Sequence, residues 1–195
     1  MKTAIQKCMI LLMVLLVSAC GGLRYSQVAP EAKDFHPKRI GVFPADVGTY
    51  EEARGTVEQV FAGTLVDKGW FTDVVDAQTI VNQMTVNEDY RKTVFDYLSK
   101  LKTINSSDPV LSKMIGEKSK IDAFCVVNID FWNYTVENEK KVGKVGLGIK
   151  MIESSTGKIM WKAGHQQSES YMLMKPDLAG IAKDLIKKMV GEMPR

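Results

Sequence analysis

The sequence contains few of the residues from which catalytic and metal sites are usually built. Its 195 residues include only two histidines and three cysteines. Neither the G-x-G-x-x-G nor the G-x-x-x-x-G-K pattern of phosphate-binding loops occurs, and there is no G-x-S-x-G nucleophile motif. We therefore expect no catalytic residues, no metal site, no cofactor and no small-molecule substrate.

The net charge is small and the main apolar run is short. A formal charge of +3 at pH 7 gives no reason to expect nucleic acid as a partner, since that requires a concentrated basic face. The apolar run over residues 9–17 is about half of the roughly 20 residues that a membrane-spanning helix needs. The chain length predicts one domain with one core.

The N-terminus has the pattern of an export signal. Lys2 and Lys7 precede the apolar run, and small residues follow it. The stretch Val17-Ser18-Ala19-Cys20 resembles the lipobox of bacterial lipoproteins, in which the cysteine is lipidated and becomes the first residue of the mature chain. The resemblance implies a signal peptide over residues 1–19. It also implies a diacylglyceryl thioether and an acylated amine on Cys20, whose acyl chains would hold the protein on a membrane.

Two other interpretations of this N-terminus stay open. One is a signal anchor or short membrane span, and the other is an ordinary secretory signal with an incidental cysteine. Gly21, rather than Asp, follows Cys20, which resembles outer-membrane sorting with the domain facing the periplasm. Inner-membrane and cell-surface placements stay open as well.

The residues after the lipobox are predicted to be a tether. Residues 20–37 would be the lipidated cysteine and a flexible linker, because 21–37 holds Gly, Pro and polar residues without periodicity. Residues 38–195 would form a single domain. With Cys8 removed and Cys20 lipidated, Cys125 would be the only thiol of the mature chain, so no disulfide could form within it.

The domain is predicted to be α/β (α+β). Apolar periodicity and capping residues indicate a βαβ unit, three helices, a three-stranded antiparallel meander and a closing C-terminal helix. The unit and the meander would form one mixed sheet flanked by helices. The predicted elements are strand 39–43, helix 51–68, strand 70–75, helices 77–84, 88–101 and 109–118, strands 122–135, 144–151 and 158–167, and a helix starting at 177.

The strand over 122–135 offers the candidate contact surface. Cys125 would lie on its buried face as an inert core thiol. Its other face would carry a polar and aromatic set suited to a protein interface, although a helix could equally cover it. On the next strand, Gly146 and Gly148 would leave room for a helix or another subunit. His165 is expected to be a packed or rim residue rather than a metal ligand. The candidate partner-contact residues are Asn128, Asp130, Trp132 and Tyr134.

The order of elements and three short segments resemble a superfamily of small envelope α/β domains. The segments are 39–44 (RIGVFP), 121–124 (IDAF) and 152–161 (IESSTGKIMW). The superfamily includes the curli-secretion channel lipoprotein, an exopolysaccharide-export ring lipoprotein, lipoprotein activators of penicillin-binding proteins and the N-terminal domain of the Tol propeller protein. These motifs are structural, so the resemblance implies a fold and an envelope setting but transfers no functional residues.

Three classes of function follow from these observations. The favoured one is a lipid-anchored, non-enzymatic envelope or secretion component that binds a protein partner or forms a homo-oligomer. The second is a regulatory lipoprotein that docks on a cell-wall synthase. The third is a hydrolase, which the scarcity of histidines and the missing nucleophile motif disfavour.

Overall fold

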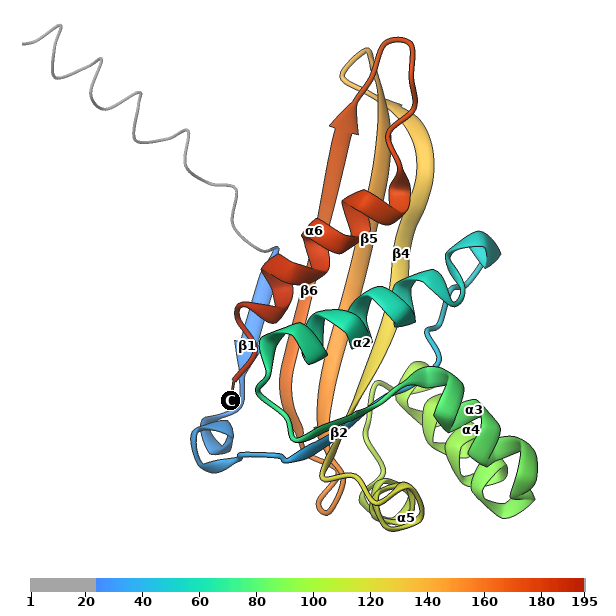
Figure 1. The fold of residues 1–195 in the computed structure, drawn as a ribbon, viewed down its shortest axis with the longest axis vertical. Coiled ribbons are helices and arrows are strands. Elements are labelled where there is room, and N and C mark those ends of the chain that lie inside the picture. Colours follow the sequence, from blue (N-terminus) through green and yellow to red (C-terminus); the bar gives the residue numbers. More distant parts are fainter. Residues whose placement is uncertain (1–23, 195) are drawn as a thin grey trace, which may run out of the picture.

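The computed structural model describes residues 24–194, which form one six-stranded mixed sheet with helices on both faces (Figure 1). The predicted signal peptide and Cys20 lie outside the described residues. The strand order is β1-β6-β5-β4-β2-β3, and the predicted fold class is confirmed. The strands are β1 (Tyr25–Val28), β2 (Arg39–Val42), β3 (Asp73–Val75), β4 (Ala123–Glu137), β5 (Lys140–Glu153) and β6 (Ile159–Ser170).

The predicted βαβ unit is present. β2 pairs in parallel with β3, and α2 (Thr56–Lys68) connects them. Gly69 ends the helix in the left-handed conformation at φ 63°, as expected for a C-terminal glycine. The helix begins at Thr56 rather than at Glu51, because Gly55 adopts φ 78° and separates it from a 3-10 turn, η3 (Glu51–Ala53).

The predicted meander is a long antiparallel sheet. β4 and β5 are joined by the two residues Asn138 and Glu139, both at positive φ, the geometry of a tight hairpin turn. β6 pairs antiparallel with β5 along almost its whole length. At its other edge, β4 pairs in parallel with β2 from Ala123 to Cys125. β4 therefore joins the meander to the βαβ unit.

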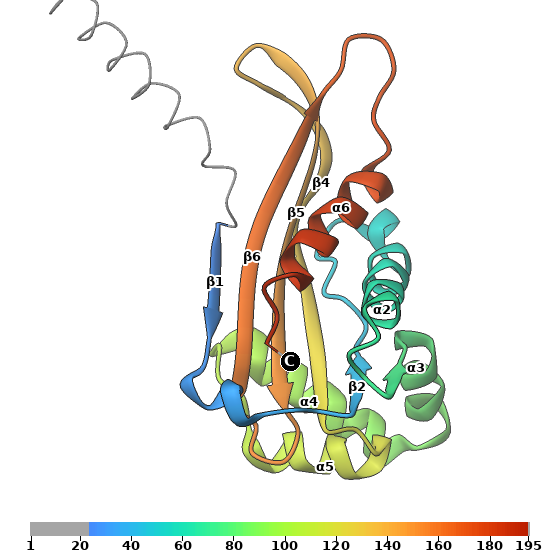
Figure 2. The same cartoon turned by 60° about the vertical axis from the view of Figure 1, so that its left-hand side comes forward.

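The helices form two layers. Two helices, α2 and α6 (Leu178–Val190), cover one face of the sheet, and three others gather at one end on the opposite face (Figure 2). These are α3 (Ala77–Val86), α4 (Glu88–Thr103) and α5 (Pro109–Ser119). The layers bury two separate clusters, the first around Phe61, Leu65, Trp161 and Leu185, the second around Phe43, Tyr90, Tyr97 and Phe124. No helix within residues 24–194 is long and apolar enough to cross a membrane.

Side-chain caps fix the starts of the helices as the sequence predicts. Asp76 accepts a hydrogen bond from the Thr79 N–H at 2.7 Å, and Asp108 accepts from the Val110 and Leu111 N–H groups. Such caps satisfy backbone donors that a helix N-terminus otherwise leaves unpaired. In α5, small residues lie on the buried face together with Ile115. Val110 is 68% exposed, while Ser112 and Gly116 face the sheet, because Ser154 packs closely there.

The predicted flexible tether is wrong from residue 25 onward. β1 pairs antiparallel with β6, with Tyr25 opposite Gly164. The Tyr25 ring lies where a side chain at position 164 would stand, so the glycine makes room for it. A 3-10 turn, η2 (Pro30–Asp34), follows and buries Ala32 in the first core cluster. The folded domain therefore begins at β1 and not at Lys38.

The hydroxyl of Tyr97 gives the second cluster a pH dependence. Tyr97 is fully buried, its hydroxyl lies 2.7 Å from the Ser107 Oγ, and its ring contacts Phe124 edge-on. Burial raises the pKa of Tyr97 to about 12. The folded state holds the proton more tightly than the unfolded chain, where the pKa is about 10. Tyr97 therefore contributes stability that is fully present below pH 10 and is lost as the pH rises toward 12.

We expect the free energy of unfolding, measured with urea, to fall by about 2–3 kcal/mol between pH 9.5 and 12 because of Tyr97. Tyr97→Phe should show a smaller fall over the same range. Tyr90, whose pKa burial also raises, contributes equally to both proteins. A variant that loses stability as steeply as the parent would contradict this assignment.

Candidate binding site

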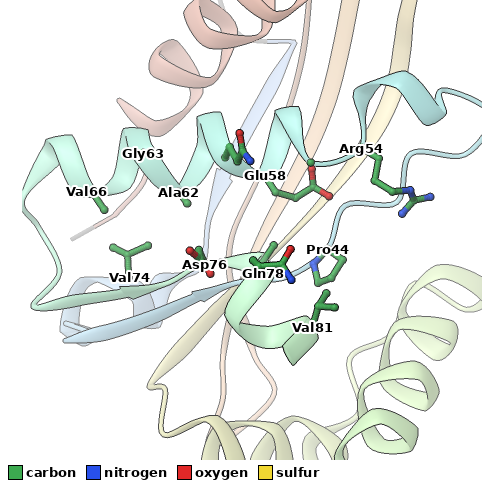
Figure 3. A pocket seen from close by; sticks show the side chains of 13 residues that line it. Pro44, Arg54, Glu58, Ala62, Gly63, Val66, Val74, Asp76, Gln78 and Val81 are labelled. Atoms are coloured by element: carbon green, nitrogen blue, oxygen red, sulfur yellow. The ribbon is translucent and has the colours of Figure 1, made fainter. Parts of the chain in front are cut away.

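A pocket of about 510 Å³ lies between α2, α3 and the loop after β2 (Figure 3). Its walls are mostly apolar, with Val66 and Val74 facing each other at one end and Val81 on α3. Glu58 and Arg54 reach toward Pro44 at the other end. The close packing of α2 against β3, fixed by the βαβ connection, places these residues together.

Glu58 is the unusual residue of this pocket. Its side chain is 4% exposed, and its Oε1 accepts a hydrogen bond from the Ala45 N–H at 3.0 Å. Its other carboxylate oxygen, Oε2, is buried and has no hydrogen-bond partner among the described residues. An unpaired buried carboxylate oxygen destabilises a fold. A ligand or partner that donated an N–H to this oxygen would recover the free energy that the missing hydrogen bond costs.

Arg54 does not neutralise Glu58 directly. Its guanidinium donates two hydrogen bonds to Glu51, at 2.8 and 3.0 Å. These bonds are the main reason why the pKa of Arg54 is raised, while the charges of Glu58 and Asp46 add less. The buried Oε2 of Glu58 is therefore left without a hydrogen-bond donor among residues 24–194.

A second, larger pocket of about 770 Å³ adjoins the first, and the two share Pro44 and Arg54 as lining residues. It lies between α4 and β4, and its rim carries Phe95, which is 58% exposed. Burial, and to a smaller extent the charge of Lys162, lowers the pKa of Lys150 in its wall. We call the two pockets together the α2–α4 groove.

The candidate contact residues on β4 do not share one face of the sheet. Asn128 lines the α2–α4 groove, and its amide donates to Asp130 at 2.8 Å. A β-bulge between Ile129 and Phe131 then shifts the alternation of side chains by one residue. Trp132 is consequently buried in the first core cluster, at 4% exposure, and Tyr134 follows it on the α6 side. The prediction of a single polar and aromatic face is therefore wrong.

The glycines of β5 receive side chains of this chain itself. Gly146 leaves room for Phe131, and Gly148 leaves room for Asn128, both from the neighbouring strand β4. The expectation that a helix or another subunit approaches these glycines is therefore wrong for this face of the sheet.

The remaining titratable candidates lie apart from the groove. Cys125 is fully buried in the first core cluster, which confirms its predicted core position, and burial raises the pKa of its thiol. That the thiol is inert stays a prediction, which its burial supports. His165 is partly buried, and its Nε2 lies 3.2 Å from the Lys188 Nζ. Desolvation, followed by the charge of Lys188, lowers the pKa of His165. Within residues 24–194 no group of His, Cys, Asp and Glu is arranged to hold a metal ion.

Sequence reasoning did not find Glu58. The residue stands in the first turn of α2, where acidic residues are ordinary because they favour the helix dipole. Its burial depends on the loop after β2 folding back so that Ala45 donates to it. One available signal was its position directly beside Val57, within the apolar stripe of the helix.

No protein-family profile and no curated protein sequence matches this chain. The solved structures do contain the same fold. The PelC dodecamer from Paraburkholderia phytofirmans matches with a TM-score of 0.55 and 15% identity, covering 88% of this chain and 98% of that one. Lipoprotein GNA1162 from Neisseria meningitidis matches with a TM-score of 0.53 and 14% identity, covering 80% and 100%.

A third match is the hypothetical protein CT253 from Chlamydia trachomatis, with a TM-score of 0.53 and 8% identity over 78% of this chain and 93% of that one. At these identities the matches establish the fold alone. The predicted fold is confirmed at that level, and one of the matching structures is itself a lipoprotein.

Two substitutions at Glu58 separate its hydrogen bond from its charge. Glu58→Gln keeps an oxygen for the Ala45 N–H and removes the unpaired charge, so we expect the free energy of unfolding to rise by about 1 kcal/mol. Glu58→Ala removes the acceptor as well and should lower it by about 1–3 kcal/mol. Urea unfolding measures both. Equal losses in the two variants would show that the charge itself stabilises the fold.

Proposed function

We propose that this chain is a lipid-anchored protein of the bacterial envelope that acts by protein contact, without catalysis, and assembles with copies of itself. The anchor is Cys20, which follows Val17-Ser18-Ala19. The folded domain begins at Tyr25, five positions later in the sequence. A lipoprotein and a dodecamer share the fold. Gly21 after the cysteine favours the outer membrane, with the domain facing the periplasm.

The observation that carries this proposal is the unpaired Oε2 of Glu58 in the wall of the α2–α4 groove. The groove combines that carboxylate with aliphatic walls and the exposed Phe95. Such a surface fits a protein segment that carries a lysine or arginine beside apolar residues. Because Oε2 is buried, the Glu58 side chain must turn toward the pocket for the cation to pair with it, while the apolar neighbours of the cation cover the aliphatic walls. We assign this segment to a neighbouring copy.

The groove is better suited to binding than to catalysis. Its carboxylate is held by a backbone N–H, and the other polar lining side chains of the α2–α3 pocket include Gln59, Gln78 and the helix cap Asp76. Nucleophilic catalysis needs a nucleophile within hydrogen-bond reach of a base. The buried Cys125 is not among the groove's lining residues.

The anchor is tested by Cys20→Ala in the full-length chain. We expect this substitution to abolish incorporation of labelled fatty acid, because Cys20 is the acylation site that the lipobox resemblance implies. Ser18→Thr, which leaves the cysteine in place, is the matched control and should label normally. A Cys20→Ala protein that still incorporates labelled fatty acid would contradict the anchor.

Self-assembly is tested on residues 21–195, which contain every described element but not Cys20. We expect sedimentation velocity to show an oligomer that Glu58→Gln and Phe95→Ser each weaken by about tenfold or more in dissociation constant, since each removes a contact proposed for the α2–α4 groove. Val110→Ser is the control, because Val110 is 68% exposed and lines neither pocket. A monomer at all concentrations would refute self-assembly and direct attention to another envelope protein, such as a cell-wall synthase.

A further inference from the structure

Three consecutive apolar side chains stand almost fully in solvent at one end of the molecule. Met172, Leu173 and Met174 are 91%, 96% and 87% exposed, more than any other large apolar side chain of residues 24–194. They lie in the loop between β6 and α6, at the same end as the β4–β5 turn and away from α3, α4 and α5 (Figure 1). A continuous run of this kind marks a contact surface.

The loop is held in place at both ends. The Tyr171 N–H donates to the Lys141 carbonyl oxygen at 2.9 Å, and the Tyr134 hydroxyl donates to the Pro176 carbonyl oxygen at 2.8 Å. Pro176 also packs against Gly143, where any side chain would collide with it. The fold therefore presents the three apolar side chains on a fixed support.

Aromatic and basic residues surround the base of the loop. The rings of Tyr134 and Tyr171 meet edge-on with centroids 5.9 Å apart, and the Lys175 Nζ lies 4.6 Å from the centre of the Tyr134 ring. Lys140 and Lys141 stand at the start of β5, directly after the adjoining β4–β5 turn. Tyrosine and lysine beside a projecting apolar group are the residues found at the boundary between lipid headgroups and acyl chains.

Charge alone would not drive this contact. Glu137, Glu139 and Glu169 lie at the same end of the molecule as the lysines, and Glu137 is paired with Lys144 at 2.6 Å. The net charge of this end is therefore small. The apolar loop would provide most of the affinity, so binding should depend weakly on the fraction of anionic lipid.

The direction of β1 points the lipid anchor to the same end. β1 runs antiparallel to β6, with Tyr25 opposite Gly164, so β1 starts at its end nearer to Ser170 of β6 and runs away from that residue (Figure 2). The stretch from Tyr25 back to Cys20 reaches at most about 17 Å when extended. The distance along β6 from Gly164 to Ser170 is about 20 Å. At full extension Cys20 would end about 3 Å short of the level of Ser170. An acyl chain on Cys20 would bridge that gap, so it could enter the bilayer surface that the loop contacts.

We propose that the loop Met172–Met174 inserts into the surface of a phospholipid bilayer as a second membrane contact beside the lipid anchor. The three apolar side chains enter the acyl boundary, and Tyr134, Tyr171 and Lys175 lie at the level of the headgroups. The inference rests on the proposed anchor for its orientation. The apolar, aromatic and basic side chains that would contact the membrane all lie within residues 24–194.

The test uses the lipidated mature protein in vesicles of phosphatidylethanolamine and phosphatidylglycerol. Leu173→Cys introduces an accessible thiol, since Cys125 is buried and Cys20 would be blocked. A nitrobenzoxadiazole label at this position should shift its emission to the blue and be quenched several-fold more by lipid-borne quenchers than the same label at Val86→Cys. Val86 is 86% exposed but lies on α3, away from the loop.

The outcomes separate the two proposals. A protein that fails to acquire acyl chains refutes the anchor, whereas an anchored protein whose label at position 173 stays in water refutes the loop insertion. A blue shift that appears equally without vesicles would show that a protein surface covers the loop, and would overturn the membrane assignment. In residues 21–195, replacing all three residues by serine should lower partitioning into the same vesicles by about tenfold or more.

Discussion

The helices on both faces of the sheet pack against the first half of β4. Cys125 is buried under α2 and α6, while the adjacent Phe124 is buried under α4, where it contacts Phe43 and Tyr97. A strand buried on both faces must be apolar at consecutive positions. At its edges β4 pairs in parallel with β2 and antiparallel with β5. The two core clusters and the two halves of the sheet are therefore held together by the same few residues.

The bulge in β4 decides what the second half of the sheet can do. By shifting the alternation, it directs Trp132 into the core and Phe131 to the opposite face. There Phe131 occupies the space above Gly146 and is covered by the Lys144 ammonium, 4.2 Å from its centre. The strands can thus extend beyond the helices on that face without a third helical layer. The projecting hairpin carries the residues that support the Met172–Met174 loop.

The sequence predicted the structure correctly where a few neighbouring residues determine it. The caps at Asp76 and Asp108, the glycine that ends α2, and the parallel βαβ unit all follow from such signals. The bulge was not predictable, since its position depends on cross-strand packing with β5. β1 was missed because its short, polar sequence becomes a strand only by pairing with β6. Glu58 was missed for the same reason, as its burial depends on a contact distant in sequence with Ala45.

The two proposed contact surfaces lie on different parts of the molecule and do not compete. The α2–α4 groove is formed by helices and the start of the sheet, whereas the apolar loop lies at the opposite end. A domain held to a bilayer by one flexible point could rotate freely, but a second contact at the loop would fix its orientation. Copies on one membrane would then present their grooves at the same height and in related directions. Such alignment raises the effective concentration of the matching surfaces, so even a groove of modest affinity could support assembly on the membrane.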